Sequence, residues 1–310
     1  MSMAVTVVYL SHGGARYHDQ ARLSILTLLH AIHTAGRSDI KIVVYTDDAS
    51  AAPRHALIAT RRLSAQDLVV DRGAWGNIHR VKTRVLARAS REFDSALFFI
   101  DSDTRWRALP TQAFAAIEAG AICLHVDEGA LGPQRFPDIM SDLRKHHAQI
   151  EALGVSVRRQ PHMWNAGVIG APAGAGAFFD KIIGVTDFLY VRIRNRLWSE
   201  QMATSLVAAS DYAVVTCEDA IHHYWAVASA SQPYISAIFA AMDPAWPIER
   251  QAAFCAAAAW DDSELMRRLE SPAARRSRRL KKLRASMAKR SLDLRLAFER
   301  MKPLLGLAPR

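Results

Sequence analysis

The sequence predicts an α/β protein with an open, mostly parallel sheet. Along the first 230 residues, short apolar runs typical of buried strands alternate with longer segments of helical period. A strand at 5–10, a helix at 17–35 and a strand at 40–48 form a βαβ unit, which predicts parallel pairing. Two of the predicted strands end directly on carboxylates, and open α/β sheets bind their ligands at the carboxyl ends of strands.

The amino-terminal elements are predicted from the spacing of apolar residues and from the glycines that mark turns and helix ends. After the strand Val5–Leu10, the turn Ser11-His12-Gly13-Gly14 has glycines that let the backbone approach a ligand. Apolar residues then recur every third position up to Ala35, and Gly36 ends this helix. The next strand finishes at Asp47 and Asp48. We expect a short helix over 56–63, a short strand over 65–70, and a helix over 79–89 that carries Lys82.

The most informative stretch is the apolar run Ala96–Ile100, which ends in Asp101-Ser102-Asp103-Thr104. Five apolar residues between polar ones indicate a fully buried strand. Because the chain bends at a strand end, Asp101 and Asp103 can converge on one point. Converging carboxylates are costly unless a cation lies between them. A divalent metal ion is the obvious candidate, and such an ion usually also carries phosphate.

The later part of the chain continues the alternation of strands and helices. One region, 127–161, is polar and broken by prolines, and we expect a single helix in it, at about 139–153. Ser199 is expected to cap the helix that it begins. The remaining expected elements are a helix at 111–120, a strand at 122–126, a strand at 164–170, a helix at 174–195, a helix at 199–209 and a strand at 212–216.

Composition separates a near-neutral body from a basic tail. The net charge is +10, but residues 271–310 contain thirteen Lys or Arg and two acidic residues, so the tail alone carries +11 and the rest about −1. The three cysteines, Cys123, Cys217 and Cys255, are far apart and odd in number, which argues against a disulfide framework or a zinc site and fits a reducing cytoplasm. The amino terminus lacks the basic start of a secretory signal.

An ordered series of motifs over roughly residues 4–230 resembles the GT-A-fold glycosyltransferases, and most closely glycosyltransferase family 8. The series consists of Tyr45-Thr46-Asp47, Lys82, Asp101-Ser102-Asp103-Thr104, Asn165-Ala166-Gly167-Val168, Glu200-Gln201 and His222-His223-Tyr224. The resemblance implies a Rossmann-like GT-A fold with a helical carboxyl-terminal extension. It also implies a hexosyltransferase-like enzyme that takes a nucleotide-diphosphate sugar, with a UDP-sugar as the first expectation.

The resemblance further implies a bound Mn²⁺ or Mg²⁺ ion held by Asp101, Asp103 and a late histidine. We prefer His223 as this ligand, because the family's histidine is typically followed by an aromatic residue, here Tyr224; His222 is the alternative. Glu200, Asn165 and Gln201 are the expected catalytic residues. The expected donor-binding residues are Ser11, Asp47, Lys82, Ser102 and Asp103.

Two positions depart from the family pattern. Glu200-Gln201 replaces the common Asp-Gln, and Trp225-Ala226-Val227 stands where the family has a glycine and Lys-Pro-Trp, so the diphosphate contacts of that loop are in question. By resemblance the reaction retains anomeric configuration. Glu200 is the best-placed carboxylate for a covalent nucleophile, and the alternative is front-face attack, in which the leaving phosphate takes the acceptor's proton.

Two regions are expected: a GT-A catalytic domain at 1–235 and an alanine-rich, then basic amphipathic, extension at 236–310. Apolar residues between 280 and 305 fall on one side of a helix, with Lys and Arg opposite. This tail is expected to pack on the domain or in a homo-oligomer, or to lie on an anionic membrane surface. The near-neutral body argues against nucleic acid as the partner.

Together these features predict a cytoplasmic glycosyltransferase, peripheral on the inner membrane surface if the tail binds there, with a glycan or lipid-linked acceptor. One rival is a sugar-1-phosphate nucleotidyltransferase, which needs a Gly-rich, Arg-containing loop after the first strand; Gly13-Gly14-Ala15-Arg16 is only a faint match. The other rival is a non-catalytic protein that binds membrane or nucleic acid through its basic tail.

Overall fold

The structure is a computed structural model that describes residues 4–132 and 134–270. These residues form two compact units, one of residues 4–225 and 232–259 and the other of residues 226–231 and 260–270. The second unit contains η3 (Ala228–Ala230) and α11 (Asp262–Glu270), which contact each other. The division at residues 235 and 236 stays a prediction, and the basic helix expected over 271–310 lies outside the described residues.

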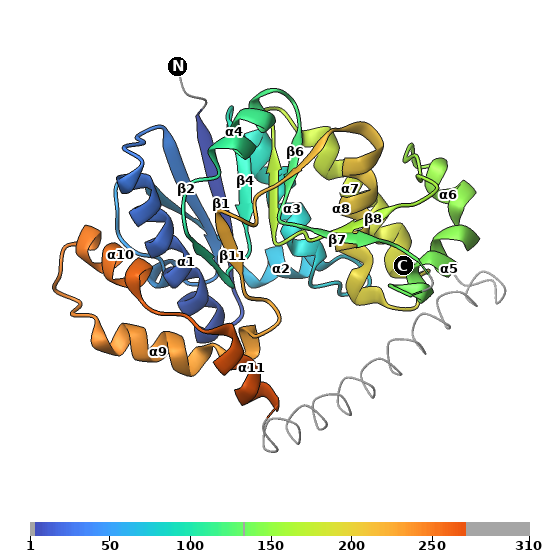
Figure 1. The fold of residues 1–310 in the computed structure, drawn as a ribbon. Helices are drawn as coiled ribbons and strands as arrows, with labels where there is room; N and C mark the ends of the chain where they lie inside the picture. Colours follow the sequence, from blue (N-terminus) through green and yellow to red (C-terminus); the bar gives the residue numbers. More distant parts are fainter. Residues whose placement is uncertain (1–3, 133, 271–310) are drawn as a thin grey trace. The chain divides into compact units, whose positions relative to one another are not determined.

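A seven-stranded sheet forms the centre of the first unit (Figure 1). Every neighbouring pair is parallel except those of β9, which runs antiparallel to β4 and β6. In spatial order the strands are β10 (Val214–Thr216), β6 (Ile122–Leu124), β9 (Val168–Ala171), β4 (Ala96–Ile100), β1 (Val5–Ser11), β2 (Ile40–Thr46) and β3 (Ile58–Arg62). The α/β prediction is confirmed, and the carboxyl ends of β4, β1 and β2 meet at one edge of the sheet.

Two small antiparallel sheets extend this edge. β5 (Thr104–Trp106) follows the two aspartates and pairs with β11 (Ile221–His223), so that Thr104 lies opposite His223. β7 (Asp127–Ala130) pairs with β8 (His162–Trp164). Both small sheets therefore bring later parts of the chain back toward the end of β4.

Helices cover both faces of the central sheet (Figure 1). On one face α3 (Arg80–Glu92), α7 (Gly176–Tyr190) and α8 (Ser199–Asp211) enclose the apolar core. On the other face lies α1 (Ala15–Thr34), against which α9 (Gln232–Ala241) and α10 (Ile248–Ala257) pack. The remaining elements are η1 (Ala49–Ala51), α2 (Ala65–Arg72), α4 (Thr111–Glu118), α5 (Pro137–Lys145), α6 (His147–Glu151) and η2 (Arg196–Trp198).

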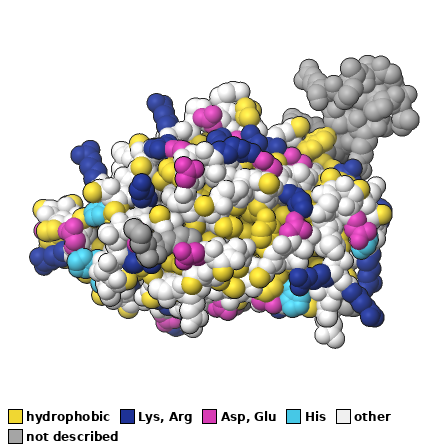
Figure 2. Space-filling view, turned by 90° about the horizontal axis from the view of Figure 1, so that it is seen from above, with side chains coloured by type: hydrophobic (Ala, Val, Ile, Leu, Met, Phe, Trp, Pro, Cys, Tyr) yellow, Lys and Arg dark blue, Asp and Glu magenta, His cyan; other side chains and the backbone are white. Residues whose placement is uncertain are grey.

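Charged side chains of both signs are mixed on one face of the protein. Figure 2 shows the protein from the end at which β1 begins, where acidic and basic side chains are interleaved around apolar areas. No helix of the described residues is both long and apolar enough to cross a membrane.

The predicted helix over 56–63 and strand over 65–70 are wrong: the first segment contains a strand and the second forms a helix. Residues 58–62 form β3, which pairs with β2 as an edge strand and is only partly buried, so its apolar alternation is weak. Residues 65–72 form α2, because the Ser64 side chain accepts from the Asp67 N–H while Asp67 accepts from the Ser64 N–H. This capping box overrides the strand preference of Val69 and Val70, both of which are exposed.

Three further boundaries differ from expectation. The single strand expected over 164–170 is two strands in different sheets, because the Asn165 side chain accepts from the Gly167 N–H and turns the chain. The helix expected over 139–153 is two, α5 and α6, which meet at His146. Ser199 does not cap α8: Trp198 holds the cap position, and the buried Ser199 hydroxyl has no hydrogen-bond partner among the described residues.

Candidate metal and nucleotide site

The end of β4 places two carboxylates side by side. After Ile100 the chain leaves the sheet, the Asp101 N–H donates to the Gly167 carbonyl at 2.8 Å, and the Thr104 hydroxyl donates to the Asp101 carbonyl at 2.8 Å. This tight turn directs Asp101 and Asp103 to the same place. Ligand atoms of Asp101, Asp103 and His223 all lie within 4.8 Å of one another. The predicted convergence thus arises from a turn and not from the strand itself.

His223 reaches this turn from β11. The Tyr224 N–H donates to the Asp103 carbonyl at 3.1 Å, and His223 Nε2 lies 3.3 Å from Asp103 Oδ1. Asn165 Oδ1 accepts from the Gly167 N–H and lies 3.0 Å from His223 Nδ1, so it can accept from that nitrogen as well. This arrangement directs Nε2 toward the carboxylates, which is the orientation a metal-binding imidazole needs.

Gly167 is required for this approach. A Cβ atom built on it would lie 2.1 Å from His223 Cε1, far inside van der Waals contact. His222, the alternative ligand, is the preceding residue on β11; its ring lies 6.0 Å from that of Tyr224, and it is not part of the cluster. Alternation along the strand separates the two histidines.

Lys82 and Glu200 form the opposite wall of the site. Lys82 Nζ on α3 lies 3.1 Å from Glu200 Oε2 on α8 and 4.0 Å from Asp101 Oδ2, and it donates to the Ala166 carbonyl at 2.9 Å. Both side chains of the pair are buried. Burial lowers the pKa of Lys82, but Asp101 and Glu200 outweigh this and raise it, so the ammonium stays charged.

The carboxylates of the site are in excess over its cations. Burial, with a further contribution from Asp103, raises the pKa of Asp101 to about 6 against the opposing charge of Lys82. Burial also raises the pKa of Glu200, partly offset by Lys82. For Asp103, burial is outweighed by the hydrogen bond from His223, which lowers its pKa. Such a set gains stability from an added cation.

Glu128 is a site residue that we did not predict. Its Oε1 accepts from Asn165 Nδ2 at 2.9 Å and its Oε2 accepts from Gln201 Nε2 at 3.0 Å, so one carboxylate orients both amides. A signal existed in the sequence, since the strand ending at Leu124 is soon followed by Asp127-Glu128, as β2 and β4 are followed by aspartates.

These groups surround a cavity of about 180 Å³. Seven predicted residues line it: Lys82, Asp101, Asp103, Asn165, Glu200, Gln201 and His223. Carboxylate oxygens and an imidazole are ligands that suit Mn²⁺ and, with more oxygen, Mg²⁺, so the donor set fits the expected ion. Ser102, half-buried between the aspartates, does not line the cavity.

Asp47 and Ser11 lie in a neighbouring cluster at the ends of β2 and β1. His18 joins them, with Nδ1 2.8 Å from Ser11 Oγ and Nε2 3.2 Å from Asp47 Oδ1. The Gly13 N–H donates to Asp47 Oδ2 at 3.0 Å. Neither residue lines the 180 Å³ cavity, but His18 lines a wider one of about 640 Å³ beside α1.

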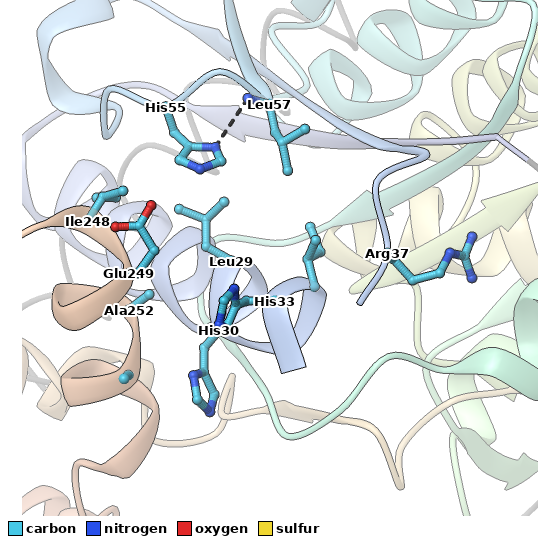
Figure 3. Close-up of a pocket in the computed structure, with 11 residues that line it drawn as sticks. Leu29, His30, His33, Arg37, His55, Leu57, Ile248, Glu249 and Ala252 are labelled. Atoms are coloured by element: carbon cyan, nitrogen blue, oxygen red, sulfur yellow. Dashed lines mark hydrogen bonds between the residues drawn. The ribbon is translucent and has the colours of Figure 1, made fainter. Parts of the chain in front are cut away.

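A third cavity, of about 300 Å³, lies between α1 and α10 (Figure 3). His30 and His33 of α1 line it together with His55 and Glu249, over an apolar floor that includes Leu29. His55 precedes β3, so this cavity is at the amino ends of the parallel strands. It is therefore separate from the carboxylate cluster.

No protein-family model matches this sequence, and no curated protein matches it. Solved structures with similarity to the chain include the galactosyltransferase LgtC in complex with donor and acceptor sugar analogues, at 9% identity and a TM-score of 0.43, covering 84% of this chain and 98% of that one. Mouse xyloside xylosyltransferase 1 matches at 10% identity and a TM-score of 0.42, covering 68% and 84%.

The bifunctional glycosyltransferase WbbM matches at 12% identity and a TM-score of 0.46, covering 87% of this chain and 52% of that one. All of these TM-scores are below 0.5. The functional proposal therefore rests on the chemistry of the site.

Proposed function

We propose that the protein is a metal-dependent glycosyltransferase that moves a sugar from a nucleotide-diphosphate sugar, in the first instance a UDP-sugar. The observation that carries this proposal is the convergence of Asp101, Asp103 and His223 in a cavity whose other wall is the Lys82–Glu200 pair. Such a cavity can hold both ends of a reacting bond, with a metal–phosphate side and a sugar side.

The metal–phosphate side consists of the two aspartates and His223. A divalent ion bound there would neutralise the diphosphate as the glycosidic bond breaks. Asn165 keeps the His223 ring oriented through its Nδ1 contact. Lys82, which is charged and 4.0 Å from Asp101, would add positive charge beside the diphosphate.

The sugar side consists of Glu200, Asn165 and Gln201. The ion pair with Lys82 supports the ionised form of Glu200, whose negative charge would stabilise the positive charge that develops on the sugar as the leaving group departs. Glu128 fixes both amides at about 3 Å, so they can position sugar hydroxyls without rearranging. Glu200 as nucleophile and front-face attack both fit this layout and both retain anomeric configuration.

Donor turnover tests the proposal directly. The protein would be incubated with UDP-galactose, UDP-glucose, UDP-N-acetylglucosamine or UDP-xylose and Mn²⁺, and released UDP would be measured with and without acceptor glycans. We expect UDP release from at least one donor, lost with EDTA and with Asp103→Asn. The matched control is Asp180→Asn, at a surface aspartate paired with Arg91. If no nucleotide sugar is bound or cleaved, or if Asp103→Asn leaves turnover unchanged, the transferase proposal is wrong.

The same experiment separates the nucleotidyltransferase rival. UTP and a sugar 1-phosphate would then be substrates, and the product would be pyrophosphate instead of UDP. A glycan or lipid-linked acceptor and peripheral membrane contact through residues 271–310 are part of the proposal, and the +11 charge of that segment supports the latter. Co-sedimentation with anionic vesicles, with and without residues 271–310, tests it; equal pelleting removes the membrane contact.

A further inference from the structure

Four side-chain nitrogens at the carboxyl end of the sheet are buried and have no hydrogen-bond partner among the described residues. They are His12 Nδ1, Arg16 Nε, Arg72 Nε and Asn77 Nδ2. His12 follows β1, Arg16 begins α1, Arg72 ends α2, and Asn77 precedes α3. All four positions are in segments that connect at the carboxyl ends of the parallel strands. Buried polar groups are normally hydrogen-bonded, so a group of such donors indicates a missing acceptor.

The two arginines also have no ion-pair partner among the described residues. Among the described residues, neither Arg16 nor Arg72 has an ion pair or hydrogen bond from its guanidinium group. The nearby acids are already occupied: Asp47 by His18 and the Gly13 N–H, and Asp71 by arginines of α3. Two guanidinium groups without an ion-pair partner among the described residues therefore remain here.

Asn77 is held in a fixed position in this group. It is only 3% exposed, its Oδ1 accepts from the His79 N–H at 3.1 Å, and no residue that the structure describes accepts from its Nδ2. The Asn77 N–H donates to the Arg72 carbonyl at 2.9 Å, which holds the two residues together. A buried amide held with its donor group unused is the pattern of a ligand contact.

The loop after β1 is held at the end of β2, where the Gly13 N–H donates to Asp47 Oδ2 at 3.0 Å. Burial lowers the pKa of His12, Asp47 opposes this, and the charge of Arg72 lowers it further. Between His12 and Arg16 in the sequence, Gly13 and Gly14 have φ of 92° and 138°, with open space where a Cβ would be.

We propose that His12, Arg16, Arg72 and Asn77 form an anion site that binds phosphate groups of the nucleotide donor. Three of the groups are N–H donors, two of them guanidinium ions, and one tautomer of the His12 ring adds a fourth, which suits phosphate oxygens better than any neutral ligand. The inference rests on the proposed function and changes which residues are assigned to the donor phosphates. No Lys or Arg occurs between His223 and Glu249, so this stretch offers the diphosphate no cation, and in this proposal the anion site supplies it.

Calorimetric binding without metal isolates this site. UDP, pyrophosphate and uridine would each be titrated in EDTA into the protein and into Arg16→Gln, Arg72→Gln and, as a matched control, Arg144→Gln, an exposed arginine on α5. We expect each of the first two variants to weaken UDP and pyrophosphate by about tenfold or more and to leave uridine unchanged, because only the charge-assisted bonds are lost. Arg144→Gln should bind like the unmodified protein.

Several outcomes would overturn the anion site. They are unchanged UDP affinity in both variants, an equal loss for uridine, or no binding of UDP and pyrophosphate by the unmodified protein. Should the variants misfold, affinity for UDP in the unmodified protein at about 0.05 and 0.5 M NaCl decides instead, since salt weakens binding to guanidinium groups. Equal affinity at both concentrations contradicts the proposal.

The two proposals fail separately. Arginine-dependent UDP binding without any sugar transfer would leave the anion site standing and end the transferase proposal. Sugar transfer with kcat/KM unchanged in Arg16→Gln and Arg72→Gln would do the reverse. Inorganic phosphate, run as a further arm, distinguishes a nucleotide site from one that binds free phosphate alone.

Discussion

Helix α3 carries cations for two buried charge clusters that differ in how well their charges are matched. In the first, Asp71 of α2 is fully buried and accepts two hydrogen bonds from Arg88, at 2.7 and 3.1 Å, while Arg84 lies 3.5 Å away. In the second, Lys82 and His223 face the carboxylates of Asp101, Asp103, Glu200 and Glu128 around a cavity.

The comparison teaches how to tell a structural cluster from a functional one. Asp71 has its oxygens bonded, its charge compensated, and no cavity beside it among those described. The Lys82 cluster has four carboxylates for two basic groups, and these groups line a cavity of about 180 Å³. We therefore expect substitutions in the first cluster to change stability, and those in the second to change metal binding and turnover.

The largest expected effect is on catalysis. Asp103→Asn should lower kcat/KM for donor turnover by about 10³-fold, roughly 4 kcal/mol in transition-state free energy, because a metal ligand is lost. Urea unfolding should show stability within about 1 kcal/mol of the unmodified protein, since the carboxylate is in excess. A large loss of stability would mean that this cluster is structural after all.

Asp71→Asn should show the opposite pattern. Removing the shared carboxylate leaves two arginines around a buried amide, and the free energy of unfolding should fall by about 3 kcal/mol, at the low end for a buried pair because both arginines are partly exposed. Donor turnover per folded molecule should not change. Urea denaturation followed by circular dichroism measures this, with Asp180→Asn as the surface control, expected to shift stability by less than about 1 kcal/mol.

Metal addition sharpens the comparison without altering the cluster at Asp71. Mn²⁺ at 100 times its dissociation constant should stabilise the unmodified protein by about 2.7 kcal/mol, since the ion binds only the folded site. The shift in melting temperature should persist in Asp71→Asn and vanish in Asp103→Asn. An equal shift in both variants would place the ion elsewhere.

The smallest effect is expected at Gly167. Gly167→Ala should displace the His223 ring and cost about 1–3 kcal/mol, with weaker Mn²⁺ binding, because the added Cβ would lie 2.1 Å from the ring. The matched control is Gly184→Ala in α7, where a Cβ meets nothing within 4 Å and helix propensity should raise stability by about 1 kcal/mol. Unchanged metal affinity in Gly167→Ala would show that His223 is not a ligand.

Prediction worked where a local pattern and its physical cause lie in the same few residues. The run Ala96–Ile100 is apolar because β4 is central and buried on both faces. The sequence therefore predicts both the strand and the aspartates at its end. Prediction failed at 56–70, where an edge strand and a capped helix have ambiguous patterns. The cap of α2 was visible in principle as Ser64 followed three residues later by an acidic residue.

The amino-acid sequence by itself determined the α/β class, the buried strand β4 and the residue types of the candidate metal site, because these depend on local hydrophobicity and on the chemistry of single side chains. Only the tertiary structure decided which groups meet. The choice between His222 and His223 depends on the pairing of β11 with β5, and the binding of Glu200 by Lys82 depends on the packing of α8 near α3. The proposed anion site likewise combines Arg16 and Arg72, which are 56 residues apart in the numbering. Such contacts are set by long-range packing, for which no local pattern exists.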